Sequence, residues 1–211
     1  MGGPNPPLLF MSDIEQFPNA LLGIDVSHWQ GAIEWDKVAE SGVKFAWIKA
    51  TEGNTITDPR LQANWQGAVA NDIPFGFYHV WTPGLTNQAE FFLEAIHPVP
   101  HAFWGALDIE PGTLTTETDE ELALAWMNAV YECGVVSKTF AYCSPSIAKV
   151  NMASPDWQKY PLWVAQYTSA LQPSLVKWSS WVFWQRQCNG TVPGVPNPVD
   201  IDWFNGPGPL A

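Results

Sequence analysis

The 211-residue sequence predicts an α/β barrel, and three observations carry that prediction. Eight short apolar segments have the length and flanking turn residues of strands, and eight strands are enough to close a filled barrel. The first five alternate with helical patterns, which implies parallel pairing through right-handed crossovers. The last three are joined by segments too short or too rich in Pro and Gly for helices. We therefore expect an irregular TIM-like barrel, (β/α)5 followed by three β-strands. An open doubly wound sheet, the alternative, leaves the helix-free end unexplained.

The predicted elements follow one another in regular order. The strands cover Leu21 to Ser27, Val43 to Lys49, Pro74 to Trp81, Phe103 to Leu107, Lys138 to Cys143, Pro161 to Tyr167, Trp181 to Gln187 and Val199 to Phe204. Helical spacing of apolar residues predicts helices over Glu34 to Ser41, Asp58 to Ala70, Thr86 (as N-cap) to Ile96, Thr118 to Cys133 and Pro145 to Asn151. The helix from Thr118 has the clearest boundaries, because its start is rich in Thr, Asp and Glu and Gly134 follows its end.

Composition indicates a compact globule. Apolar residues make up 46% of the chain and charged residues 14%, and the length suits one domain. Residues 1–20 are rich in Pro, Gly and Asn and predict an N-terminal arm, so the barrel domain is expected over 21–211. The net charge of −12 argues against nucleic acid and anionic membrane surfaces as partners. The 13 Trp residues fit either a large core or a groove that stacks on sugar rings.

The cysteines and the N-terminus bear on the compartment. Cys133, Cys143 and Cys188 have no metal-ligand spacing and, being three, cannot all pair with one another. Residues 1–16 lack the basic region and the apolar length of a signal peptide, and no run approaches the ~18–20 apolar residues of a membrane span. We expect a protein made in the cytoplasm without a signal peptide and without a membrane anchor.

Two carboxylates stand at the end of the fourth predicted strand. Asp108 and Glu110 follow the apolar run that ends at Leu107, and Pro111 and Gly112 stop the strand. Side chains at positions i and i+2 of a strand point to the same face, so the two acids emerge side by side. Their mutual repulsion makes such a pair costly for a strand that only builds the fold. The alternative is a strand that runs into an acidic, solvated turn.

The other strand ends add polar residues to the same face, because the functional residues of such barrels lie at the C-terminal ends of the strands. Strands one and eight are neighbours in a closed barrel, so Asp25 and Asp200 are expected to approach each other. A bowl of carboxylates rimmed by Trp, Tyr and Gln results. Its predicted members are Asp25, Ser27, Lys49, Tyr78, His79, Asp108, Glu110, Tyr142, Trp163, Gln166, Gln185, Asp200 and Asp202.

Crowded carboxyl groups suit glycoside hydrolysis. One carboxylic acid protonates the leaving oxygen, and a second carboxylate acts on the anomeric side of the sugar. Crowding raises the pKa of one member and lets it hold a proton near neutral pH. The four histidines, His28, His79, His97 and His101, have no spacing that suggests a metal site. We expect neither a metal nor another cofactor.

The motifs at these strand ends resemble those of glycoside hydrolase family 25 lysozymes, the Chalaropsis-type muramidases common among phage endolysins. They occur in family order over about 180 residues: GIDVSHWQG (23–31), FAWIKATEG (45–53), GFYHVW (76–81), ALDIEPG (106–112), LWVAQY (162–167), VFWQ (182–185) and VDIDWF (199–204). The resemblance implies an irregular barrel of five β/α units and three further strands. It departs from the family at Asp202, where Asn is usual, and in the longer N-terminal arm.

The resemblance also implies roles. Glu110 would be the general acid, and Asp108 would orient the 2-acetamido group of the substrate or stabilise a charged intermediate formed from it. Asp25 and Asp200 would tune the protonation of this pair and hold the sugar. Side chains expected to line the saccharide groove are Lys49, Tyr78, Tyr142, Trp163, Gln166 and Gln185.

Simpler interpretations remain for single residues. Asp25 could cap its local turn, and Lys49 could neutralise the acids without touching substrate. Ser27 and His28 lack the glycines of a nucleophile elbow.

The resulting functional hypothesis is an N-acetylmuramidase that cleaves the β-1,4 bond between N-acetylmuramic acid and N-acetylglucosamine. Its partner would be bacterial peptidoglycan, and we expect a monomer. A non-catalytic saccharide-binding or virion module on the same fold and a glycosidase for another N-acetylated polymer are the alternatives. We expect action on the cell wall after release, as a phage endolysin or virion-associated lysin, rather than as a secreted autolysin.

Overall fold

Eight strands close into a barrel in the computed structural model, which describes residues 20–99 and 102–206. Hydrogen-bonded neighbours follow the order β1, β9, β8, β7, β6, β5, β4, β2, and a β1–β2 pairing completes the ring. The predicted irregular barrel is confirmed; the predicted arm lies, up to residue 19, outside the described residues. The strands are β1 (Leu21–Val26), β2 (Phe45–Glu52), β4 (Phe75–Val80), β5 (Trp104–Ile109), β6 (Lys138–Cys143), β7 (Leu162–Ala165), β8 (Phe183–Gly190) and β9 (Val199–Phe204).

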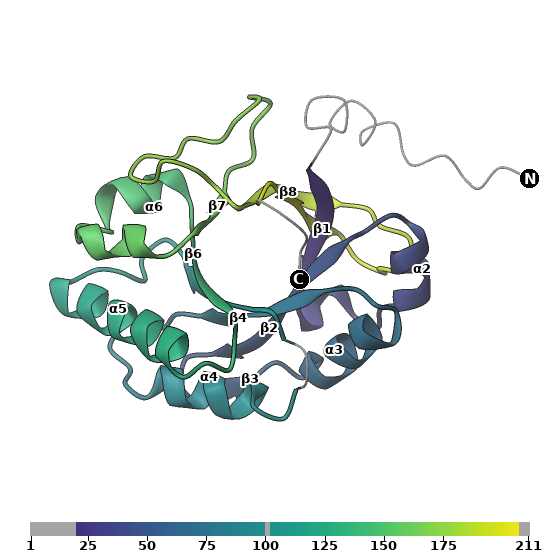
Figure 1. Ribbon diagram of the computed structural model, residues 1–211, viewed down its shortest axis with the longest axis horizontal. Coiled ribbons are helices and arrows are strands. Elements are labelled where there is room, and N and C mark those ends of the chain that lie inside the picture. Colours follow the sequence, from purple (N-terminus) through teal and green to yellow (C-terminus); the bar gives the residue numbers. More distant parts are fainter. Residues whose placement is uncertain (1–19, 100–101, 207–211) are drawn as a thin grey trace, which may run out of the picture.

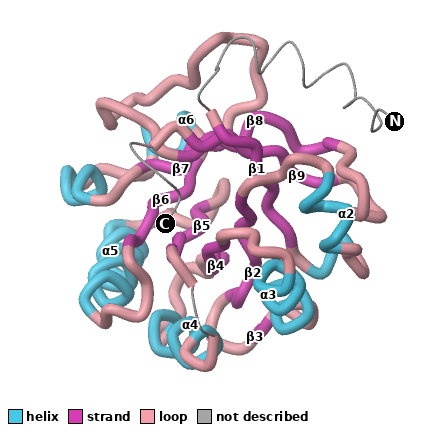
Figure 2. The backbone as a smooth tube through the Cα atoms, turned by 45° about the vertical axis from the view of Figure 1, so that its right-hand side comes forward, coloured by secondary structure: helices cyan, strands magenta, loops and turns pink. Residues whose placement is uncertain are grey.

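Helices cover the outside of the ring over most of its circumference (Figure 1). The part of the ring where β7, β8 and β9 follow one another is connected by loops (Figure 2), as the sequence predicted. A two-residue strand, β3 (Ile56–Thr57), folds back on the end of β2 and was not predicted. The helices are η1 (His28–Gln30), α2 (Trp35–Glu40), α3 (Leu61–Ala70), α4 (Gln88–Ile96), α5 (Glu117–Glu132), α6 (Pro145–Val150) and η2 (Pro155–Lys159).

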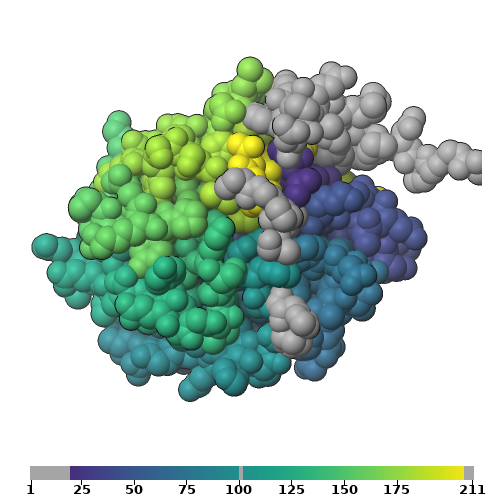
Figure 3. All heavy atoms as spheres, viewed as in Figure 1, coloured from purple at the N-terminus to yellow at the C-terminus, as the bar shows by residue number. Residues whose placement is uncertain are grey.

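The direction of the last strand corrects one expectation. β9 is antiparallel to both of its neighbours, β1 and β8, whereas the other barrel pairings are parallel. Asp200 therefore reaches the functional face from the start of its strand and not from the C-terminal end. The antiparallel register sets Asp200 opposite Asp25 and Asp202 opposite Gly23, one layer deeper. The two ends of the described chain lie side by side in the packed molecule (Figure 3).

The barrel interior is filled by aromatic rings. Because side chains alternate along a strand, every second residue of each strand points inward. Trp47 and Trp163 stack at the centre, with ring centroids 4.6 Å apart and planes 11° from parallel. This interior cluster comprises Phe45, Trp47, Tyr78, Trp104, Ala106, Phe140, Trp163, Phe183 and Phe204. The opposite faces of the strands pack against the helices in a second, larger core.

Most tryptophans belong to these cores. All but Trp29 and Trp65 are buried, and Trp29 is 72% exposed. The composition allowed a sugar-binding groove built from many indoles, and this prediction is wrong for most of the Trp residues. All three cysteines are free, in agreement with the absence of a predicted disulfide framework.

Two helix starts differ from the sequence prediction. α4 is preceded by Asn87, in the left-handed conformation with φ 63°, and Thr86 does not cap it. α3 begins at Leu61, because the Asp58 side chain accepts a hydrogen bond from the Arg60 N–H and holds residues 58–60 as a turn. The prediction for α5 is close: Thr116 caps its start, and Gly134 follows its end with φ 70°.

Gly23 is one of the glycines that make room for the aromatic interior. A Cβ on Gly23 would lie 2.2 Å from Cζ of Phe45, far inside van der Waals contact. A Cβ on Gly105, on the helix-facing side of β5, would meet its neighbours at an ordinary 3.4 Å. We expect Gly23→Ala to lower the free energy of unfolding by about 1–3 kcal/mol or more, because overpacking displaces the Phe45 ring.

Chemical denaturation of the two alanine variants tests this expectation. Gly105→Ala is the matched control, and it should change the free energy of unfolding by less than about 1 kcal/mol. Equal unfolding midpoints for both variants would contradict the packing described for the barrel interior.

Candidate active site

A cavity of about 350 Å³ opens at the end of the barrel where the parallel strands finish. Its walls are almost entirely polar side chains, and its base lies on the aromatic interior described above. The residues that line it, here called the acid cavity, are Asp25, Tyr78, Asp108, Glu110, Tyr142, Trp163, Tyr167, Gln185, Cys188 and Asp200.

The end of β5 supplies two acids in different surroundings. Asp108 is 8% exposed, whereas Glu110, just past the last residue of the strand, is exposed. Oδ1 of Asp108 is buried without a hydrogen-bond donor. Burial, followed by the negative charge of Glu110, raises the pKa of Asp108 well above its usual value, while Lys49 opposes the shift. The pair therefore combines two different carboxyl groups. That of Asp108 is buried and has an acceptor oxygen without a donor, and that of Glu110 is accessible at the rim of the cavity.

β1 and β9 bring three more carboxyl groups together. Asp25 and Asp200 are directly opposite in the β1–β9 register, and their carboxyl groups interact electrostatically. Burial, followed by the charge of Asp25, raises the pKa of Asp200 to about 8. Burial raises the pKa of Asp202, which has no exposed surface, to about 7. The pKa of Asp25 is also well above its usual value, because of burial and then the charge of Asp202.

Gln185 holds Asp25 in place. Its Nε2 donates to Oδ2 of Asp25 at 2.7 Å, and its Oε1 accepts hydrogen bonds from the Tyr142 and Tyr167 hydroxyl groups at 2.9 and 2.7 Å. Burial raises the pKa of both phenols, so they remain neutral donors. The amide is thereby fixed in one orientation, with its donor side toward the acid. Asp25 uses this contact and not the local turn, which Ser27 caps instead.

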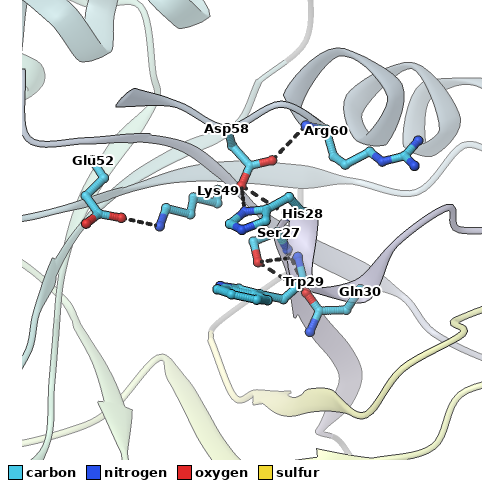
Figure 4. Close-up of polar contacts among 8 residues, drawn as sticks. All are labelled: Ser27, His28, Trp29, Gln30, Lys49, Glu52, Asp58 and Arg60. Atoms are coloured by element: carbon cyan, nitrogen blue, oxygen red, sulfur yellow. Dashed lines mark hydrogen bonds and ion pairs between the residues drawn. The ribbon is translucent and has the colours of Figure 1, made fainter. Parts of the chain in front are cut away.

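Three predicted groove residues have other contacts. Lys49 and Gln166 do not line the acid cavity: Lys49 Nζ donates to Glu52 Oε2 at 2.7 Å (Figure 4), and Gln166 Oε1 accepts from the Ser174 N–H at 2.7 Å. Trp163 lines the base of the cavity but is 2% exposed, and its Nε1 donates to Asp202 Oδ1 at 2.7 Å. The predicted residues that do surround the cavity are Asp25, Tyr78, Asp108, Glu110, Tyr142, Trp163, Gln185 and Asp200.

A rigid segment follows the end of β1 (Figure 4). Ser27 and Gln30 form a capping box around η1, so Ser27 is used in holding the backbone. Both the N–H and Nδ1 of His28 contact Oδ2 of Asp58, at 3.0 and 2.8 Å. The exposed indole of Trp29 projects from this support, with its ring centroid 4.6 Å from that of His28. Ser27 and His28 are thus committed to structure, as the missing nucleophile-elbow pattern suggested.

His79 is also structural. It is fully buried, contacts Thr51 Oγ1 at 2.7 Å and Gln88 Oε1 at 3.1 Å, and burial lowers its pKa to about 4. His101 lies outside the described residues. Within residues 20–99 and 102–206, no group of three or more His, Cys, Asp or Glu side chains could hold a metal ion. No helix in those ranges has the length and apolar character to cross a membrane.

Sequence reasoning missed two residues of the cavity, and it placed Asp202 in the bowl itself and not beneath it. Tyr167 and Cys188 line the cavity, and Asp202 lies below it. The alternation of side chains could have placed Cys188 only if the irregular register of β8 beyond Gln185 were known. Tyr167 lies two residues beyond the end of β7, so strand periodicity does not determine its direction.

A comparison with protein families identifies the barrel. The family model described as glycosyl hydrolases family 25 matches residues 24–195. This match runs from the middle of β1 to beyond β8 and includes Asp25, Asp108, Glu110 and Gln185.

Individual proteins show the same similarity. Lysozyme M1 of Streptomyces globisporus is 34% identical over 204 residues, covering 89% of this chain and 69% of that protein. The Escherichia coli K12 protein called "Uncharacterized protein YegX" is 34% identical over 192 residues, covering 87% and 69%. The crystal structure of the bacterial lysozyme from Streptomyces coelicolor superposes with a TM-score of 0.76 at 31% identity, covering 88% of this chain and 92% of that one.

The raised pKa of Asp200 makes stability depend on pH. The folded protein binds this proton more tightly than the unfolded chain, in which the pKa is about 4. The free energy of unfolding should therefore fall as pH rises from about 4 through about 8. We expect the melting temperature of the wild type to fall between about pH 5 and about pH 9, and that of Asp200→Asn to fall less.

Glu94→Gln, which removes one carboxylate from the exposed side of α4, is the control for net charge. Its melting temperature should follow the wild-type pH dependence. The interpretation of Asp200 fails if Asp200→Asn and Glu94→Gln show the same slope.

Proposed function

The chain belongs to glycosyl hydrolase family 25, and from this premise we propose that it is an N-acetylmuramidase, a lysozyme that hydrolyses bacterial peptidoglycan. The bond cleaved is the β-1,4 linkage between N-acetylmuramic acid and N-acetylglucosamine. The observation that carries the proposal is the acid cavity itself, in which Asp108 and Glu110 stand beside Asp25 and Asp200. Glycoside hydrolysis needs such carboxyl groups in different states of burial and protonation.

Glu110 is the general acid in this proposal. It is the exposed member of the β5 pair, so it can reach the oxygen of a glycosidic bond lying across the cavity mouth. Its carboxyl proton passes to that oxygen as the bond to the anomeric carbon breaks. The same residue then removes a proton from the attacking water in the second step.

Asp108 orients the 2-acetamido group. Its carboxyl group lines the cavity and can accept the acetamido N–H of the substrate. The acetamido oxygen would then attack the anomeric carbon, with the electron pair of the glycosidic bond leaving on the oxygen protonated by Glu110. Water opens the resulting ring and restores the acetamide, so the anomeric configuration is retained. Direct attack of water in a single displacement is the alternative, and it inverts the configuration.

Asp25, Asp200 and Gln185 support this pair. The two aspartates are buried and adjacent, which raises the pKa of each and opposes their joint ionisation, so the net negative charge around the substrate is limited. Gln185 and the phenols of Tyr142 and Tyr167 fix Asp25 and supply polar groups for sugar hydroxyls. No step in this scheme uses a metal or an organic cofactor.

The proposed partner is the glycan strand of the cell wall, bound by a monomer. The net charge of −12 disfavours nucleic acid and anionic lipid surfaces as competing partners. We propose that the protein reaches the wall after release from the cell that makes it, as a phage endolysin or virion-associated lysin would.

Removing the titrating proton of Glu110 tests the proposal. We expect Glu110→Gln to release soluble fragments from purified peptidoglycan about 10²–10⁴-fold more slowly than the wild type, because general acid catalysis is lost while shape is kept. Glu121→Gln, on α5 away from the acid cavity, is the matched control and should retain the wild-type rate. A Glu110→Gln variant that releases fragments at nearly the wild-type rate would refute the role given to Glu110.

The configuration of the first product separates the two routes. Nuclear magnetic resonance at early times should show the β-anomer of the new reducing end, because two successive inversions retain configuration. An initial α-anomer would rule out the acetamide route while leaving the muramidase proposal intact.

A further inference from the structure

Asp202 is the most deeply buried carboxyl group of the site. It lies on β9 one layer below Asp200, opposite Gly23 of β1 and Gln185 of β8, and has no exposed surface. Its Oδ1 accepts the Trp163 indole N–H at 2.7 Å. Its Oδ2 is also buried, yet no N–H or hydroxyl group donates to it. A buried, ionised oxygen left in this state is strongly destabilising.

The neighbour of Asp202 is a second carboxyl group. Asp25 and Asp202 lie on the same face of adjacent strands, two residues out of register, and interact electrostatically. Gln185 donates to Asp25 Oδ2 at 2.7 Å, but it does not donate to Asp202 Oδ2. Two ionised carboxylates cannot hydrogen-bond to each other, because each is only an acceptor.

We propose that Asp25 and Asp202 share one proton, and that Asp202 is a positioning residue which holds Asp25 at the floor of the acid cavity through this contact. The shared proton satisfies the buried oxygen and leaves the pair with a single negative charge. Trp163 fixes the far side of Asp202, so the chain of contacts runs from the aromatic interior to Asp25. The positioning role of Asp202 in catalysis rests on the proposed muramidase function, whereas the shared proton is independent of that function.

The surroundings favour retention of the proton. Asp25 faces Asp202 from β1, and Asp200 lies on β9, the strand of Asp202. The phenol of Tyr167 interacts electrostatically with Asp202. Asp108 faces Asp25 from β5. These groups are acids or neutral phenols. Burial raises the pKa of both members of the pair, as expected for adjacent carboxyl groups that cannot both ionise.

An asparagine at position 202 can reproduce the contact without a titrating proton. Its carbonyl oxygen can accept from Trp163, and its amide can donate to an ionised Asp25, so the pair keeps one negative charge. A leucine of similar volume can do neither. Asp202→Asn and Asp202→Leu therefore separate the hydrogen bond from the space that the side chain fills.

The test measures muramidase activity and melting temperature against pH for both variants, with Glu94→Gln as the charge control. We expect Asp202→Asn to keep kcat within about threefold near neutral pH and to move the alkaline limb of its activity upward by about one pH unit. Because the folded pair binds its proton more tightly than the unfolded chain, wild-type stability falls as pH rises through about 7. The melting temperature of Asp202→Asn should fall less over the same interval.

Asp202→Leu should lose kcat at every pH with KM little changed, since Asp25 is then unsupported. If Asp202→Leu does not fold, the activity and melting profiles of Asp202→Asn alone test the proposal. An alkaline limb and a melting profile of Asp202→Asn that both match the wild type would overturn the shared proton. Loss of activity in Asp202→Asn equal to that in Asp202→Leu would overturn the positioning role. The melting profiles remain informative even if the protein has no muramidase activity.

Discussion

The constraint on which the structure depends is the burial of carboxyl groups above a closed, aromatic floor. Trp47, Trp163 and their neighbours fill the barrel below the acids, so water cannot hydrate these carboxyl groups from beneath. Ionisation of Asp25, Asp108, Asp200 and Asp202 is therefore costly, and all four have raised pKa values. A site that must supply and hold protons near neutral pH follows from this arrangement.

Barrel closure provides the geometry. The β1–β9 register sets Asp25 and Asp200 opposite each other, although they are far apart in the sequence. Residues two apart on a strand share a face, so on β5 the inward side chains run from Trp104 and Ala106 in the aromatic interior to Asp108 at the cavity. Glu110 differs from the other acids because it follows the last residue of β5 and is exposed. Glycoside hydrolysis requires carboxyl groups with different roles, and one accessible acid beside several buried ones meets this requirement.

The sequence predicted much of this arrangement, because strand length and the i, i+2 rule are local properties. The pairing of Asp108 with Glu110 followed from them, and the approach of Asp25 to Asp200 followed from closing eight strands into a barrel. The direction of β9 did not, since a strand reads alike in either direction when no crossover helix precedes it. The contacts of Lys49 with Glu52 and of Gln166 with Ser174 depend on side-chain direction beyond the strand ends. The depth of Asp202 depends on the register between β9 and β1, which no local pattern encodes.

The most direct test of the whole account is the chemistry of the new chain end. Purified peptidoglycan is digested with the protein, reduced with borohydride and analysed by mass spectrometry, with chitin digested in parallel. We expect muramitol at the reduced ends of the peptidoglycan fragments and no soluble products from chitin. Reduced N-acetylglucosamine ends, release from chitin alone, or binding to peptidoglycan without any new reducing end would contradict the account.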